Sequence, residues 1–219
     1  METAIAVVFQ LAVLIFSVVI HEVAHGLAAG ALGDHTAKYA GRLTLNPIKH
    51  LDPVGSFLVP MLTFVIPRLL GGSGFIIGWA KPVPYNPHNF KIKNQDLGAA
   101  IVGAAGPAAN ITVALIFGFL LRIITGWHSA FGAAALPLAE IMSVIVFVNL
   151  ILAVFNLVPI PPLDGSKVLF YFLPRSLLNL KFFLEHYGFI VLLLFVFYFS
   201  SFIAPIVIFL FRLVTGTGL

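Results

Sequence analysis

The sequence predicts an all-α membrane protein built as a polytopic bundle of helices. Of the 219 residues, 60% are hydrophobic and only 9% are charged, whereas a soluble domain carries about 25% charged residues to keep its surface in water. Long apolar runs recur along the chain, and roughly 20 apolar residues in a helix cross the hydrocarbon core of a bilayer. These two observations exclude a soluble globular protein, and the length fits one integral membrane domain over residues 1–219.

Four apolar runs are long enough to be membrane spans, at residues 4–32, 97–124, 138–157 and 187–211. We interpret the first run as a span and not as a signal peptide. Its N-terminal flank carries Glu2 in place of basic residues, and no short apolar region with a cleavage site follows. In the last run, Pro205 predicts a kink, because proline removes a helical hydrogen bond.

A fifth apolar stretch, residues 54–70, is 17 residues long, contains Pro60 and Pro67, and is followed by a glycine-rich segment. If it returns to the side from which it entered, ten of the twelve Lys and Arg residues share the inner face. If it crosses, this asymmetry vanishes. Because basic residues concentrate in cytoplasmic loops, we expect residues 54–84 to be re-entrant or surface-lying, with the N-terminus outside. The ten residues are Lys38, Arg42, Lys49, Arg68, Lys81, Lys91, Lys93, Lys167, Arg175 and Lys181.

The absence of cysteine and the distribution of charge exclude several classes of function. Zero cysteines exclude disulfides, thiolate metal sites and a cysteine nucleophile. The net charge of +4 comes without a dense Lys/Arg patch, so nucleic acid is not an expected partner, and the lipid bilayer is. Small residues over 98–106, like Gly26 and Gly30, permit close helix contact. The sequence gives no indication of an oligomeric state.

The first span contains the motif His21-Glu22-Val23-Ala24-His25. Residues four apart share one helix face, so the two imidazoles can bind one ion with Glu22 beside it. The alternative is a pair of ordinary buried histidines. A charge at the centre of a span costs about 2.5–3.5 kcal/mol, however, and a bound cation offsets that cost. The motif therefore predicts a divalent metal in the membrane.

Asp164 is the candidate third ligand. Prolines at 159, 161 and 162 end the third span, so the chain becomes extended just before this carboxylate. Counting helical rise inward from the outer face gives a depth of about 24 Å for His21 and about 21 Å for the end of the third span. The alternative is a surface Asp-Gly turn. The shared depth favours a metal ligand.

Three motifs together resemble the site-2 protease family of intramembrane zinc metalloproteases. They are H-E-x-x-H at 21–25, G-P-x-x-N at 106–110 and N-x-x-P-x-P-x-L-D-G at 156–165. The resemblance implies a three-helix catalytic core, to which this chain adds a C-terminal span. It also implies a Zn²⁺ ion held by His21, His25 and Asp164, with Glu22 as the general base. With no PDZ-like or CBS domain, the chain resembles a minimal form of the family.

The resemblance further implies where substrate binds. Asn110 and Asn156 are expected to lie near the active site or to contact substrate. Gly78, Trp79, Ala80, Lys81 and Pro82 are similar to the family's re-entrant β-like loop, which holds substrate in extended form. The implied activity is hydrolysis of peptide bonds in membrane-spanning protein substrates, as in regulated intramembrane proteolysis. We expect the chain to lie in a prokaryotic cell membrane, with its active site nearer the cytoplasmic face.

Two other functions compete with proteolysis. A membrane zinc transporter can carry H-E-x-P-H-E on a helix, but here Ala24 replaces the proline and Gly26 replaces the second acid, which removes a ligand for a second metal. A catalytically silent relative that only binds membrane helices is the other alternative. The intact Glu22 argues against it, because a scaffold has no use for a base beside the metal.

Overall fold

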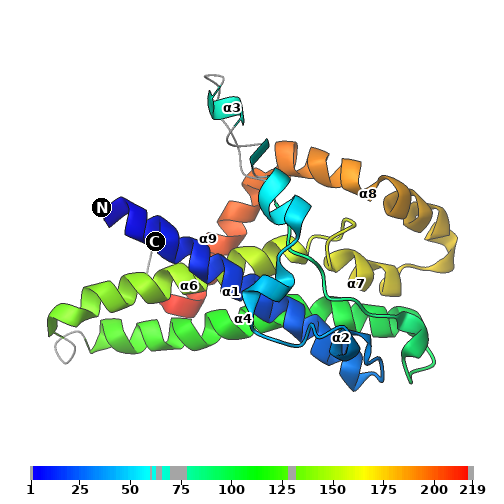
Figure 1. The fold of residues 1–219 in the computed structure, drawn as a ribbon, viewed down its shortest axis with the longest axis horizontal. Coiled ribbons are helices and arrows are strands. Elements are labelled where there is room, and N and C mark those ends of the chain that lie inside the picture. Colours follow the sequence, from blue (N-terminus) through cyan, green and yellow to red (C-terminus); the bar gives the residue numbers. More distant parts are fainter. Residues whose placement is uncertain (1, 60, 63–65, 70–77, 128–131, 217–219) are drawn as a thin grey trace.

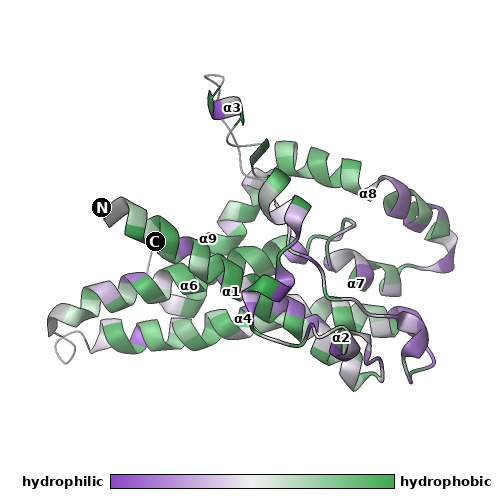
Figure 2. Cartoon of the chain, viewed as in Figure 1, coloured by the Kyte–Doolittle hydropathy of each residue, from purple (hydrophilic) through white to green (hydrophobic). Residues whose placement is uncertain are grey.

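The computed structural model describes residues 2–59, 61–62, 66–69, 78–127 and 132–216. Within these residues helices dominate and no strand is assigned. Four of the described helices are long and apolar enough to cross a membrane: Ala4–Ala31, Gln95–Gly126, Ala135–Asn156 and Arg175–Phe199. The predicted all-α polytopic class is therefore confirmed. Figure 2 shows the hydrophobic lengths of these helices, with hydrophilic residues gathered around α2 and the start of α4.

Three long helices pack side by side at the centre of the molecule (Figure 1): α1 (Glu2–Ala31), α4 (Gln95–Gly126) and α6 (Ala135–Asn156). Near one end, α9 (Ile203–Thr215) packs against α4 and α6. Side chains of these three helices form a hydrophobic cluster. Its buried members are Ala114, Leu121, Val146, Leu150, Val207 and Phe211.

Helix α4 approaches its neighbours closely because small residues line it. Its first turn is capped by Asn94, whose side chain accepts a hydrogen bond from the Leu97 N–H. A methyl group on Gly106 would lie 2.5 Å from the His21 ring of α1, so this glycine permits the close helix contact that the sequence predicts. On α1, by contrast, no atom of the described residues lies within 4 Å of a methyl group added to Gly30, so they do not make the predicted close contact there.

The C-terminal region differs from the single span expected at 187–211. The structure contains α8 (Leu178–Phe199), a 3₁₀ turn at Ser200–Phe202, and then α9. Pro205 explains the break: it lacks an N–H and is tolerated in the first turn of a helix but not in its interior. Helix α8 lies apart from the central helices (Figure 1), and its Gly188 lies against Pro161.

Short elements fill the connections between the long helices. They are α2 (Thr36–Tyr39), a 3₁₀ turn at Pro47–His50, a π turn at Val54–Leu58, α3 (Ile66–Leu69), 3₁₀ turns at Pro87–Asn89, Gly132–Ala134 and Arg175–Leu177, and α7 (Gly165–Phe172). Of the segment expected to be re-entrant, residues 60, 63–65 and 70–77 lie outside the described part. Residues 78–86 run as irregular chain.

Asp34 ties the end of α1 to the segment that precedes α4. Its buried carboxylate accepts hydrogen bonds from the Asn86 N–H at 2.7 Å, the Asn89 side chain at 2.8 Å and the Thr36 hydroxyl at 2.5 Å. Burial acts to raise the pKa of Asp34. Hydrogen bonds from the Asn89 and Thr36 side chains and from the Asn86 and Thr36 backbone outweigh it and hold the pKa below its ordinary value.

This carboxylate makes the stability of the protein depend on pH. Because the folded-state pKa is lowered, the stabilisation is complete above the unfolded value of about 3.9 and is lost as pH falls through the folded-state pKa. We expect Asp34→Asn to lower stability at pH 7 by about 1–3 kcal/mol and to flatten the loss of stability below pH 4. Thermal unfolding in detergent at pH 7 and pH 3 measures both. The exposed Asp96 offers a control: Asp96→Asn should retain the acid-dependent loss, and equal pH profiles for Asp34→Asn and the native protein would contradict the prediction.

Candidate metal centre

His21 and His25 lie one turn apart on α1 and direct their rings to one side of the helix. Their ring centroids are 4.7 Å apart and the planes are nearly perpendicular. Both side chains are buried, with 6% of each residue exposed. The i, i+4 spacing therefore brings two imidazole nitrogens together at the interface of α1 and α4, as the 3.6-residue period of a helix requires.

Asp164 reaches the same point from the turn between α6 and α7. Helix α6 ends at Asn156, and the chain turns back over residues 157–163 before α7 begins at Gly165. A methyl group on Gly165 would lie 2.2 Å from the Leu157 carbonyl oxygen, so only glycine lets this turn close. The Asp164 Oδ2 atom lies 3.0 Å from His21 Nε2 and 3.1 Å from His25 Nε2.

The ring nitrogens and the carboxylate oxygen that point away from the centre of this cluster also make hydrogen bonds. His21 Nδ1 lies 2.5 Å from Asn110 Oδ1, and His25 Nδ1 lies 2.6 Å from the Val102 carbonyl oxygen. The second carboxylate oxygen, Asp164 Oδ1, accepts a hydrogen bond from Lys167 Nζ at 2.8 Å. These contacts orient the three side chains so that Nε2, Nε2 and Oδ2 face one another. Metal-binding histidines make the same kind of outer contacts.

The residues fit a zinc ion by chemistry and by spacing. Two imidazoles and one carboxylate are a donor set found in catalytic zinc sites, where bonds of about 2.0–2.2 Å separate tetrahedral ligand atoms by about 3.3–3.6 Å. The observed separations of 3.0 and 3.1 Å are slightly shorter than this range. Helix α4 leaves room for the rings, because a methyl group on Gly106 would lie 2.5 Å from His21 Nε2.

Glu22 lies beside the cluster but has a different partner. One ligand atom each of His21, Glu22 and His25 lies within 4.8 Å of the others. The Glu22 Oε2 atom accepts a hydrogen bond from the Val83 N–H at 2.8 Å. Asp164 is therefore the carboxylate nearest to both rings, and Glu22 is held at a distance that a water molecule can bridge.

Residues 78–82 run past the site as an exposed segment whose backbone is anchored on one side. Trp79 N–H donates to the Gly55 carbonyl and its own carbonyl accepts from Ser56 Oγ. Lys81 N–H donates to the His50 carbonyl. The buried Arg42 donates to the carbonyls of Lys81, at 2.5 Å, and Pro82. Gly78, Trp79, Lys81 and Pro82 are exposed and Ala80 is half-buried. The next residue, Val83, contacts the cluster through its N–H, which donates to Glu22.

Of the two asparagines that the sequence predicts near the active site, Asn110 contacts a histidine of the cluster and Asn156 hydrogen-bonds within its own helix. Asn110 is fully buried and contacts His21 directly. Asn156 is half-buried, and its side chain donates to the Leu152 carbonyl of its own helix. Thus Asn110 joins the cluster as a partner of a histidine, whereas the hydrogen bond of Asn156 stays within α6.

Sequence reasoning missed three residues around the cluster: Lys167, Asn149 and Ser17. Lys167 lies three residues after Asp164, a spacing at which helical side chains meet. Asn149 lies in the middle of an apolar run. A polar amide at membrane depth needs a partner as much as a charge does, and that signal could have identified Asn149.

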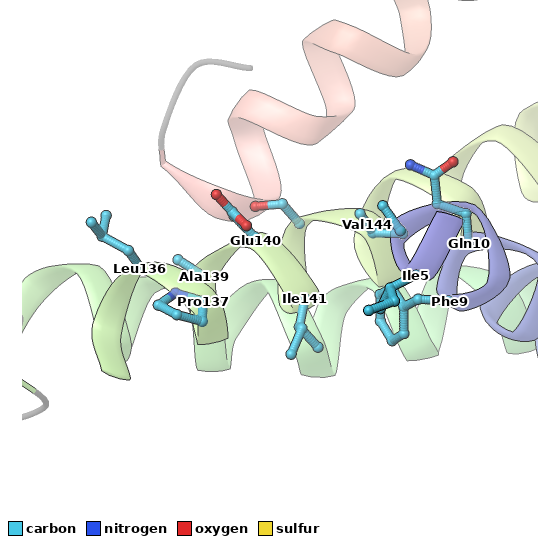
Figure 3. A pocket seen from close by; sticks show the side chains of 11 residues that line it. Ile5, Phe9, Gln10, Leu136, Pro137, Ala139, Glu140, Ile141 and Val144 are labelled. Atoms are coloured by element: carbon cyan, nitrogen blue, oxygen red, sulfur yellow. The ribbon is translucent and has the colours of Figure 1, made fainter. Parts of the chain in front are cut away.

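A cavity of about 800 Å³ lies elsewhere, between the start of α1 and the start of α6 (Figure 3). Its lining is mostly apolar, with Gln10, Glu140 and Ser143 as the polar residues. Gln10 is eleven residues before His21, or about 16 Å along the helix. The cavity is therefore separate from the His21-His25-Asp164 cluster.

Comparisons with known proteins agree with this geometry. The profile of peptidase family M50 matches residues 129–198. A protein of Bacillus subtilis (strain 168) named "Putative zinc metalloprotease YwhC" is 40% identical over 181 residues, which cover 82% of this chain and 76% of that protein. The protein named Rip2 is 34% identical over 158 residues in Mycolicibacterium smegmatis and 32% identical over 154 residues in Mycobacterium tuberculosis H37Rv.

The two Rip2 alignments cover 71% and 70% of this chain but only 53% and 52% of the relatives, so the chain spans about half the length of Rip2. No solved structure gives a significant match. Apolar helices around a buried His-His-Asp cluster with an adjacent glutamate define a zinc metalloprotease embedded in the membrane. The chain belongs to peptidase family M50, the site-2 protease family, and the resemblance described from its motifs is confirmed.

Proposed function

We propose that this protein is an intramembrane zinc metalloprotease that hydrolyses peptide bonds of membrane-spanning protein substrates. The observation that carries the proposal is the approach of Asp164 Oδ2 to within 3.0 and 3.1 Å of the Nε2 atoms of His21 and His25. These three residues are the proposed metal ligands. When bound, Zn²⁺ lowers the pKa of a coordinated water to about 7 and polarises a scissile carbonyl.

In this proposal Glu22 is the general base. Its Oε2 accepts the Val83 N–H, which fixes the orientation of the carboxylate and leaves Oε1 to take a proton from the attacking water. The same atom later gives that proton to the leaving amine. An extended substrate is needed, because a helix hides its carbonyls in its own hydrogen bonds.

The segment 78–84 offers such a substrate an edge to pair with. The backbone groups of residues 79, 81 and 83 bond inward, to residues 55 and 56, to residues 50 and 42, and to Glu22 respectively. In extended chain, alternate residues direct their backbone groups to opposite sides. Gly78 and Ala80 therefore face outward, whereas the Pro82 carbonyl accepts a hydrogen bond from Arg42. Ala80 offers both an N–H and a carbonyl to a substrate strand.

The proposed setting is a prokaryotic cell membrane, with the N-terminus outside and the metal cluster nearer the cytoplasmic face. The family and the apolar helices make the chain an integral membrane protein. The orientation is supported by the ten-to-two distribution of basic residues, and the bacterial relatives support the setting. We propose a single membrane domain in which residues 54–84 re-enter from the inner side.

Metal removal tests the proposed function. We expect the purified protein to cleave at least one of a panel of single-span polypeptides, to lose this activity when a chelator removes the metal, and to regain it with Zn²⁺. Mg²⁺ and Ca²⁺ should not restore cleavage, because they prefer sites made of oxygen ligands. Mass spectrometry of the products gives the cut sites. Cleavage that persists in protein shown to be metal-free would overturn the proposal, as would wild-type protein that fails to bind zinc.

A further inference from the structure

A network of hydrogen-bonded, buried polar side chains extends from His21 through the interface of α1, α4 and α6. Asn110 Nδ2 donates to Asn149 Oδ1 at 2.8 Å and to the Ser17 carbonyl at 3.2 Å. Asn149 Nδ2 donates to Ser17 Oγ at 2.9 Å and to the Ile145 carbonyl at 2.9 Å. Asn110 and Asn149 are fully buried and Ser17 is 3% exposed. Such a network among apolar helices calls for an explanation.

The backbone carbonyls that end this series of hydrogen bonds fix which group donates and which accepts in each of them. The carbonyls of Ile145 and Ser17 are backbone groups and can only accept. Asn149 must therefore turn its NH₂ group to Ile145, which leaves its Oδ1 facing Asn110. In turn, Asn110 must direct its NH₂ group to Asn149 Oδ1 and the Ser17 carbonyl. Neither amide can flip without placing an oxygen against an oxygen.

This fixed orientation decides the tautomer of His21. Asn110 Oδ1 is left facing His21 Nδ1 at 2.5 Å and can only accept, so Nδ1 carries the proton. The lone pair of a neutral ring then lies on Nε2, the atom that faces Asp164. His25 reaches the same state directly, since its Nδ1 faces the Val102 carbonyl. Backbone carbonyls thus determine the tautomer of both imidazole rings, directly for His25 and through the two amides for His21.

We infer that Asn149 and Ser17 are positioning residues, which act through Asn110 to hold His21 in the tautomer and orientation that bind zinc. This inference rests on the proposed zinc site. It gives Asn110 a role as an orienting partner of His21, distinct from the contact with substrate that the family resemblance suggests. It also gives a reason for two fully buried amides on α4 and α6.

The test compares two substitutions on α6. Asn149→Leu has a similar size but removes the acceptor for Asn110 and the donor to Ile145. Val146→Ala removes a fully buried side chain of the hydrophobic cluster one turn away and leaves the polar network intact. We expect Asn149→Leu to weaken zinc binding about 10-fold, the lower end of the range for outer partners of a metal ligand. Val146→Ala should lower thermal stability with zinc affinity unchanged.

Two readouts separate positioning from a general loss of structure. Zinc affinity is measured by competition with a chelator, and the His21 Nδ1–H proton is followed by NMR in the zinc-loaded protein, assigned with His21→Gln. The inference predicts that this resonance shifts and exchanges faster with water in Asn149→Leu but not in Val146→Ala. An unchanged resonance and affinity in Asn149→Leu would overturn the inference while leaving the proposed function intact. Failure of the wild-type protein to bind zinc would overturn both.

Discussion

Replacing Glu22 with glutamine is expected to lower the cleavage rate about 10²–10⁴-fold, the usual contribution of a general acid–base group, while zinc stays bound. The substitution keeps the size of the side chain, and its carbonyl oxygen still accepts the Val83 N–H that Glu22 Oε2 accepts at 2.8 Å. What is lost is the ability to take up a proton. The rate per bound zinc on a single-span polypeptide and the zinc content of the purified protein are the two measurements.

Glu140 provides the matched control for this substitution. It is an exposed glutamate near the start of α6 and lines the cavity at the opposite end of α1 from the metal cluster. Glu140→Gln removes the same charge and should leave the rate unchanged. If Glu22→Gln cleaved as fast as the wild-type protein, Glu22 could not be the base. If it lost its zinc, Glu22 would belong to the ligands, and the division of roles between Glu22 and Asp164 would be wrong.

Replacing Gly106 with alanine is expected to weaken zinc binding by more than the ~100-fold that loss of an outer partner causes. The added methyl group would lie 2.5 Å from His21 Nε2, a proposed metal-binding atom, and 2.6 Å from His25 Cε1, the atom next to another. Neither ring can move away freely, because Asn110 and the Val102 carbonyl hold their Nδ1 atoms. Zinc affinity by chelator competition gives the effect directly.

Gly30 is the matched glycine on α1, also inside a helix. Within the described part of the chain, nothing lies within 4 Å of a methyl group added there, so Gly30→Ala should bind zinc normally. It should also raise stability by about 0.5–1 kcal/mol, since alanine is the better helix former. A Gly106→Ala protein that bound zinc as tightly as Gly30→Ala would show that the rings do not occupy the positions described here.

Much of the fold could be predicted from the sequence, because the bilayer restricts the choices. Spans must be helical and about 20 residues long, so apolar runs alone located α1, α4 and α6. The helices of the C-terminal region are harder to predict, since hydropathy marks 187–211 as one apolar run. Where a helix breaks depends on packing as well as on Pro205, and the structure begins the helix at Leu178 and ends it at Phe199.

Which groups can meet on one helix follows from their spacing along the chain. The spacing of His21 and His25 puts two imidazoles on one face of α1 because a helix repeats every 3.6 residues, and the cost of a charge at membrane depth indicates a cation. The packing of the helices sets which atoms face the proposed cation. The approach of Asp164, the closeness of Gly106 and the orientation set by Asn149 join residues 39 to 143 positions apart. Such contacts depend on how the helices pack against one another, which the spacing of residues within one helix does not determine.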